Sequence, residues 1–137
     1  MPRIHILRLI LLTIFILAVL HAAAMAFFLY GYYWWFDIPM HFLAGLCVGL
    51  AALWCYFSTD WRMHIPTLSL HVLVVALLGA FVVGIAWECF EYSIGLTYNA
   101  IGNYRLDTLK DLTMDITGGC AAYLYFISKG YHRNIFK

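Results

Sequence analysis

Four stretches of the chain are long and apolar enough to cross a membrane. They run from about residue 6 to 30, 38 to 57, 68 to 92 and 106 to 128. Each is close to the roughly 20 residues that a helix needs to cross about 30 Å of hydrocarbon. Because lipid offers no partner to backbone N–H and C=O groups, we expect helices here rather than open strands. The sequence therefore predicts an all-α membrane protein, a bundle of four transmembrane helices forming a single domain over residues 1–137.

The composition supports membrane insertion and excludes other classes. Hydrophobic residues make up 65% of the chain and charged residues only 11%, too few charges to cover a water-soluble domain of this size. The formal net charge is +1, and no cluster of Lys and Arg forms a basic patch, so nucleic acid is excluded as a partner. The expected partners are membrane lipids.

The N-terminal stretch resembles a signal peptide. Arg3 and Arg8 precede an apolar run that ends in small residues at 22–24. The apolar run continues past these alanines to Tyr30, however, so we expect a retained helix.

The distribution of Lys and Arg predicts the orientation. Six of these residues fall on one side of the predicted helices and two, Arg105 and Lys110, on the other. Since Lys and Arg are enriched on the cytoplasmic side, both termini are predicted to be cytoplasmic. The aromatic segment 31–36 then lies at the outer interface. This arrangement is that of a protein of the bacterial inner (plasma) membrane.

Small residues suggest where helices pack closely. Gly45 and Gly49 form a GxxxG pattern in the second predicted helix, and Gly118 and Gly119 lie in the fourth. Small side chains allow helix backbones in a membrane to approach each other. We interpret both sets as helix-packing positions.

Six of the seven acidic residues are predicted to lie toward the outer face, at the ends of three helices. A carboxylate in or near a bilayer core is costly, and it usually marks a functional site. Converging carboxylates need positive charge, which a divalent cation supplies most simply. The candidate metal ligands are these six acids and one histidine: Asp37, His41, Glu88, Glu91, Asp107, Asp111 and Asp115.

Helical spacing groups these side chains. Asp107, Asp111 and Asp115 step by four residues and share one stripe, and Asp37 and His41 share a face in the same way. Glu88 is expected in the inner part of the site with Asp111, Asp115 and His41. A carboxylate-rich set with one imidazole suits Mg²⁺, Mn²⁺, Ca²⁺ or Fe²⁺, and suits Zn²⁺ less well.

Other roles compete for the outer members of the set. Asp107 and Asp37 stand near helix starts and could cap them, and Glu91 could simply meet water. Lys110 and Arg105 could balance the charge of the acids or bind a phosphate.

Three motifs resemble those of the VanZ-like superfamily of small membrane proteins, and most closely its YjdF-like branch. The chain has Asp-x-x-x-His-Phe at 37–42, Glu-x-x-Glu before an aromatic residue at 88–92, and Asp-x-x-x-Asp at 107–111 ahead of the two glycines. VanZ-like proteins tend to carry Gln and Asn where this chain has Glu91 and Asp115, and the two extra acids favour metal binding here. VanZ itself is associated with low-level teicoplanin resistance.

Three functions fit this pattern. The first is a metal-dependent enzyme acting at the outer leaflet on a lipid or a lipid-linked envelope phosphate, with His41 or Glu91 transferring the proton. The second is a proton- or cation-coupled transporter, which with so few helices would have to form a homo-oligomer. The third is a non-catalytic membrane scaffold. No nucleophile motif or phosphate-binding loop in the sequence decides among them.

Overall fold

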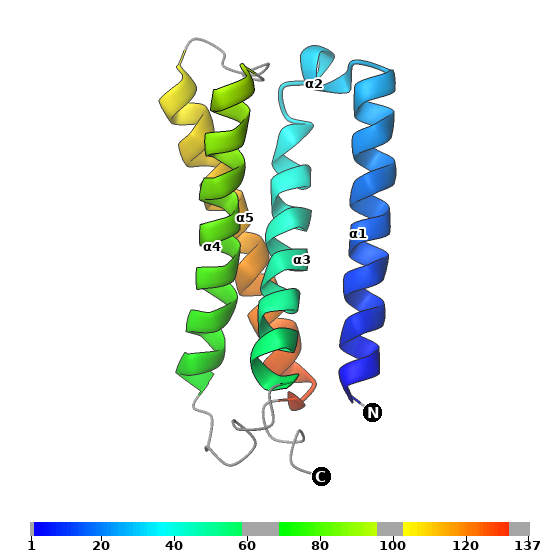
Figure 1. Ribbon diagram of the computed structural model, residues 1–137, viewed down its shortest axis with the longest axis vertical. Helices are drawn as coiled ribbons and strands as arrows, with labels where there is room; N and C mark the ends of the chain where they lie inside the picture. Colours follow the sequence, from blue (N-terminus) through cyan, green and yellow to red (C-terminus); the bar gives the residue numbers. More distant parts are fainter. Residues whose placement is uncertain (1, 59–68, 96–102, 132–137) are drawn as a thin grey trace.

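The computed structural model describes residues 2–58, 69–95 and 103–131, and within these ranges the chain is helical and contains no strand (Figure 1). The elements are α1 (Pro2–Ala26), α2 (Leu29–Tyr32), α3 (Asp37–Ser58), α4 (Ser69–Ile94) and α5 (Tyr104–Ser128). The four long helices alternate in direction, so the start of α1 and the end of α5 lie at the same end of the bundle. The prediction of an all-helical fold is confirmed.

The first predicted helix, 6–30, is wrong at both ends. The structure starts α1 at Pro2 and ends it at Ala26. Phe28 then adopts a left-handed conformation, with φ of 53°, and this residue breaks the helix before the short α2 begins. A left-handed conformation is unfavourable for a bulky residue, and here the carbonyl of Phe28 accepts hydrogen bonds from the backbone N–H groups of Gly31 and Tyr32. The other three predicted helices differ from the structure by only a few residues.

Three helices have the length and composition of membrane spans. They are Ile4–Ala26, Asp37–Phe57 and Ser69–Ile94. The fourth long helix, α5, has 25 residues, enough for about 37 Å at about 1.5 Å per residue. Because its first half is rich in charged residues, α5 does not have the apolar composition of the other three helices. The predicted fourth span therefore stays a prediction.

The contact between α3 and α5 depends on glycines, as the sequence indicates. A Cβ atom on Gly45 would overlap the backbone of Asp115, and one on Gly118 would overlap the backbone of Phe42. The absence of a side chain at these positions therefore lets the two backbones touch. This close contact turns the polar start of α3 toward the acidic stripe of α5.

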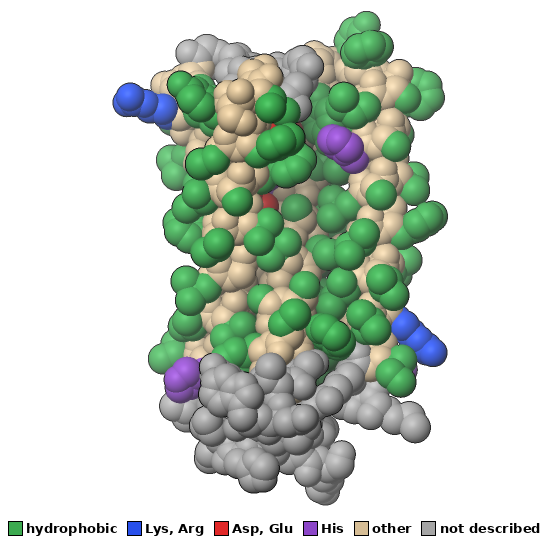
Figure 2. Space-filling view, in the orientation of Figure 1, with side chains coloured by type: hydrophobic (Ala, Val, Ile, Leu, Met, Phe, Trp, Pro, Cys, Tyr) green, Lys and Arg blue, Asp and Glu red, His purple; other side chains and the backbone are tan. Residues whose placement is uncertain are grey.

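The core and the outer surface are both apolar. Leu50, Leu53, Val72 and Phe126 are fully buried, and the Phe126 ring stacks on another aromatic ring, Phe57, at 5.0 Å. These residues fill the half of the bundle that is remote from the acids, where α3 and α5 end (Figure 1). Figure 2 shows hydrophobic side chains over most of the visible surface of the helices, as expected for a surface that faces lipid.

Candidate functional site

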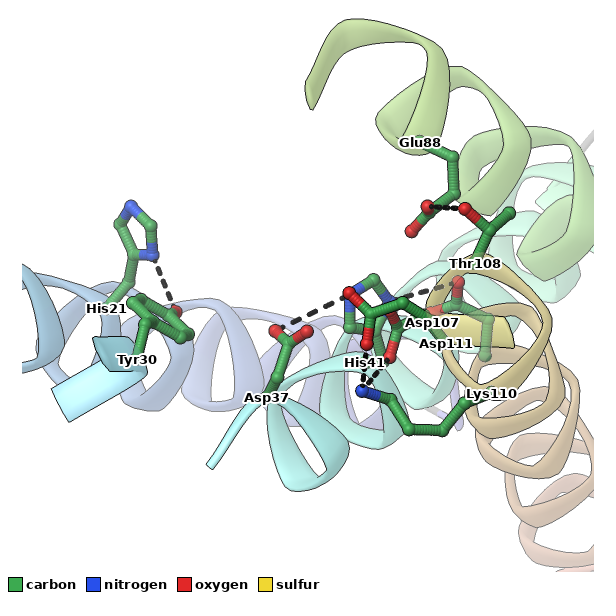
Figure 3. A network of polar contacts seen from close by, with 10 residues as sticks. His21, Tyr30, Asp37, His41, Glu88, Asp107, Thr108, Lys110 and Asp111 are labelled. Carbon is green, nitrogen blue, oxygen red and sulfur yellow. Dashed lines mark hydrogen bonds and ion pairs between the residues drawn. The ribbon is translucent and has the colours of Figure 1, made fainter. Parts of the chain in front are cut away.

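Polar side chains from three helices meet at one end of the bundle (Figure 3). Because α3 and α5 begin at this end and α4 ends there, residues distant in the sequence lie at one level. Five polar or charged residues are buried in the described parts of the chain, and all but the first belong to this cluster: Thr13, His41, Glu88, Asp111 and Asp115. The three acids that the sequence placed in the inner part are thus the buried ones.

His41 lies between two carboxylates. Its Nδ1 is 3.3 Å from Asp115 Oδ2, and its Nε2 is 3.6 Å from Asp37 Oδ1. Because the contact with Asp115 is the shorter of the two, we assign the proton of the neutral ring to Nδ1, which then donates it to Asp115. In the neutral ring the lone pair is then on Nε2, which faces Asp37. This is the tautomer in which His41 can bind a cation.

One trio of residues has the geometry of a cation site in the described part of the chain. Asp37, His41 and Asp111 each offer one ligand atom, and these atoms all lie within 4.8 Å of one another. Ligand atoms about 2.0–2.2 Å from a shared ion are about 3–3.5 Å apart, so movements of about 1 Å would close the trio. Asp115 orients the ring from behind, as outer carboxylates do for metal-bound histidines. The residues therefore fit a divalent cation.

The structure changes the grouping of the acids. Asp37, expected at the rim, lies in the centre with His41 and Asp111. Glu88 lies on the α4 side, where its Oε2 accepts a hydrogen bond of 2.8 Å from the Thr108 hydroxyl. Its other oxygen, Oε1, is buried and has no hydrogen-bond partner. The trio does not include Glu88, Glu91, Asp107 or Asp115, and their assignment as direct ligands stays a prediction.

Lys110 points into the cluster. Its Nζ is 2.6 Å from Asp107 Oδ1 and 3.3 Å from Asp111 Oδ1. Of its two suggested roles, these contacts are those expected for balancing the charge of the acids, and the phosphate role stays a prediction. The Arg105 side chain is exposed and leaves its suggested phosphate role open.

Asn103, not Asp107, caps α5. The Asn103 side chain accepts a hydrogen bond of 3.1 Å from the backbone N–H of Arg105. Asp107 lies within the first turn of the helix and pairs with Lys110 instead. The capping alternative for Asp107 is therefore wrong, because the helix already begins at Tyr104.

Two further residues at the cluster escaped the sequence analysis. Thr108 binds Glu88, as described above. Tyr30, between α1 and α3, shares a hydrogen bond of 2.9 Å with His21 Nδ1. Burial, with added repulsion from Asp37 and Glu91, raises the pKa of Tyr30 to about 12. No helical pattern indicates either residue, since Thr108 looks like an ordinary first-turn residue and Tyr30 like part of an aromatic belt.

Comparison with known proteins identifies the family. A family model described as "Predicted membrane protein (DUF2238)" matches residues 1–132. The chain belongs to this family. YjdF-like is a name of DUF2238 proteins, so the resemblance to that branch is confirmed, whereas nothing found supports the wider VanZ-like relation. No curated protein and no solved structure matches this DUF2238 chain.

Proposed function

We propose that this DUF2238 protein binds a divalent cation at Asp37, His41 and Asp111, close to the outer face of the membrane. The observation that carries the proposal is the trio of ligand atoms within 4.8 Å, in which His41 and Asp111 are buried and Asp37 is partly buried, with Asp115 3.3 Å from the other nitrogen of His41. The hardness of the carboxylate ligands favours Mg²⁺, Mn²⁺, Ca²⁺ or Fe²⁺ over Zn²⁺.

The charge of the cluster supports a bound cation. Its acids face two side chains that can carry positive charge, Lys110 and His41, and His41 must be neutral to bind metal. Lys110 is shared between Asp107 and Asp111. Carboxylates left without partners at this depth are costly. A divalent cation offsets this cost where the ligand atoms are closest.

The function that follows is a metal-dependent enzyme acting on a lipid or lipid-linked phosphate at the outer leaflet. A bound cation of this kind polarises a phosphoryl oxygen or lowers the pKa of a water molecule. Both nitrogens of His41 are occupied in this arrangement, one by Asp115 and one by the cation. Proton transfer therefore falls to Glu91, which is partly buried about one helical turn beyond Glu88. Exposed Arg105 would bind substrate phosphate from the outer side.

Transport is the weaker alternative. The acids gather at one end, and the half of the bundle beyond them is filled by Leu50, Leu53, Val72 and Phe126, all fully buried. Among the residues that the structure describes, no buried acid, base or histidine lies outside the cluster to continue a proton or cation path toward the other face. A scaffold without a ligand would not require the Asp115–His41 arrangement, and the experiment below distinguishes it.

The proposal includes a membrane arrangement. α5 completes a four-span bundle because its acids face the other helices and its length matches theirs. Both termini are then cytoplasmic in the bacterial plasma membrane, by the distribution of Lys and Arg. A homo-oligomer belongs to the transport alternative and is not needed for the enzyme.

Metal content tests the proposal. We expect protein purified without chelator to hold about one divalent ion per chain by elemental analysis. Asp37→Asn combined with Asp111→Asn should remove it, because an amide oxygen is a weaker ligand than a carboxylate. Asp60→Asn is the matched control, since Asp60 is the one acid that the sequence places at the opposite end.

The results separate the three functions. Wild-type protein without metal, after incubation with each candidate ion, would refute the cation site. Bound metal together with cation flux into liposomes would favour transport. Loss of folding in the double variant, with no metal in the wild type, would favour the scaffold.

A further inference from the structure

Glu88 is the buried acid that the cation trio does not use. Only 5% of its surface is exposed. Its Oε2 accepts from Thr108, and its backbone carbonyl accepts from the Tyr104 hydroxyl at 3.2 Å. Its Oε1 is buried with no partner at all. Leaving such an oxygen unpaired costs about 1–3 kcal/mol, and more when it is charged, so this oxygen is placed to accept a hydrogen bond from a ligand.

The orientation of Glu88 supports this role. Figure 3 shows its carboxyl group pointing away from α4 toward the other side chains of the cluster. Thr108 fixes the carboxyl group through Oε2. The free oxygen is therefore held in one position rather than turning toward solvent.

Charge determines which donor suits this oxygen. The basic side chain of the cluster, Lys110, is shared by Asp107 and Asp111. His41 is held between Asp115 and Asp37. In an acidic cluster whose own cations are already engaged, a positively charged donor is bound more strongly than a neutral hydroxyl. A primary ammonium group, with three N–H donors and one positive charge, matches Glu88 best.

The surface of the bundle indicates where the ammonium group comes from. Figure 2 shows small areas of acidic side chain on the flank where α4 and α3 lie, among mostly hydrophobic side chains. In a membrane this flank faces lipid. A headgroup can thus reach the cluster sideways while its acyl chains stay in the bilayer.

We propose that the site receives the headgroup of an amine-bearing phospholipid, with its ammonium group on Glu88 Oε1 and its phosphate on the cation held by Asp37, His41 and Asp111. This inference rests on the proposed function and names its substrate class. The phosphate is common to most phospholipids, whereas the ammonium group distinguishes one class. Glu88 is accordingly the residue that selects the substrate.

A matched pair of lipids tests the proposal in the wild-type protein. Phosphatidylethanolamine and phosphatidylcholine share the phosphate and differ in that only the first has N–H donors. The full chain is placed in nanodiscs containing equal amounts of both, partly delipidated in detergent, and analysed by mass spectrometry for retained lipid. We expect phosphatidylethanolamine to be retained at least about tenfold over phosphatidylcholine, as for one charge-assisted hydrogen bond.

Glu88→Gln is the decisive variant because it keeps the size of the side chain and replaces an acceptor oxygen by a donor. We expect the lipid preference to fall below about twofold, with metal content unchanged. Ser93→Ala is the control, since Ser93 lies on the same helix, is exposed and bonds only its own helix. It should keep the full preference.

The outcomes separate this proposal from the cation site. Equal retention of the two lipids by metal-loaded wild type would overturn the headgroup assignment and leave the cation site standing. Unchanged preference in folded Glu88→Gln would overturn the role of Glu88. Soluble ethanolamine is also added to the protein in phosphatidylcholine nanodiscs. If it binds, and if its binding depends on Glu88 in the same way, the ammonium group need not come from a lipid and that part of the proposal is overturned. Absence of metal with the lipid preference retained would overturn the cation site, and with it the placement of the phosphate, but not the role of Glu88.

Discussion

Gly45→Ala tests whether the contact between α3 and α5 builds the site. The added Cβ would lie 2.7 Å from both Cα and C of Asp115 and still closer to its carbonyl oxygen. Carbon atoms pack at about 3.5–4.0 Å, so the helices must separate by about 1 Å. The obstacle is backbone on both sides, and no side chain can turn away to relieve it.

The magnitude follows from this separation. Overpacking of this kind costs about 1–3 kcal/mol of stability. The His41–Asp115 contact is already 3.3 Å long, and an added ångström takes it beyond hydrogen-bond range. We therefore expect Gly45→Ala to lower the thermal unfolding midpoint and to weaken cation binding at the same time.

The assay compares two alanine variants. Gly31→Ala is the matched control, because a Cβ there would meet nothing within 4 Å. Unfolding midpoints in detergent and metal content are measured for both variants and the wild type. If Gly45→Ala unfolds like Gly31→Ala and holds the same metal, the reasoning from helix contact to site geometry is refuted.

Three further predictions concern single residues. Asp115→Ala should weaken cation binding about 10–100-fold, since the outer partner of His41 is lost; calorimetric titration of the purified protein measures this, and unchanged affinity would contradict the assigned tautomer. Asn103→Ala should destabilise the protein by about 0.5–2 kcal/mol by uncapping α5, which chemical denaturation measures; no change would show that the cap does not matter. The raised pKa of Tyr30, about 12, means that between about pH 10 and 12 the unfolded chain ionises this group while the folded chain does not. Stability therefore falls with rising pH in that window, less so in Tyr30→Phe, and tyrosinate absorbance of the two proteins should differ near pH 12 rather than near pH 10.

The sequence alone predicted the helices well. The length of an apolar stretch can be read directly from the sequence and predicts a membrane helix. Three of the four predicted ranges therefore agree with the structure to a few residues. Its main errors were at the chain reversal after α1, where Phe28 takes a left-handed conformation, and at the cap of α5. The spacing of Asp111 and Asp115 correctly placed both on a buried face.

Partnerships within the cluster were beyond sequence reasoning. Asp37 was expected at the rim but lies in the trio, and Lys110 could as well have pointed to solvent. Glu88 was recognised as costly, yet its hydrogen bond to Thr108 and its unpaired oxygen depend on how α4 faces α5.

Taken by itself, the sequence determined that this protein is a helical membrane protein with six of its seven acids toward one end, because length, hydropathy and spacing along a helix are local properties. The tertiary structure decided which acids meet. The rotation and axial offset between α3 and α5 are set where Gly45 and Gly118 let the backbones touch. That contact brings His41 between Asp37 and Asp115, and no pattern within either helix encodes it.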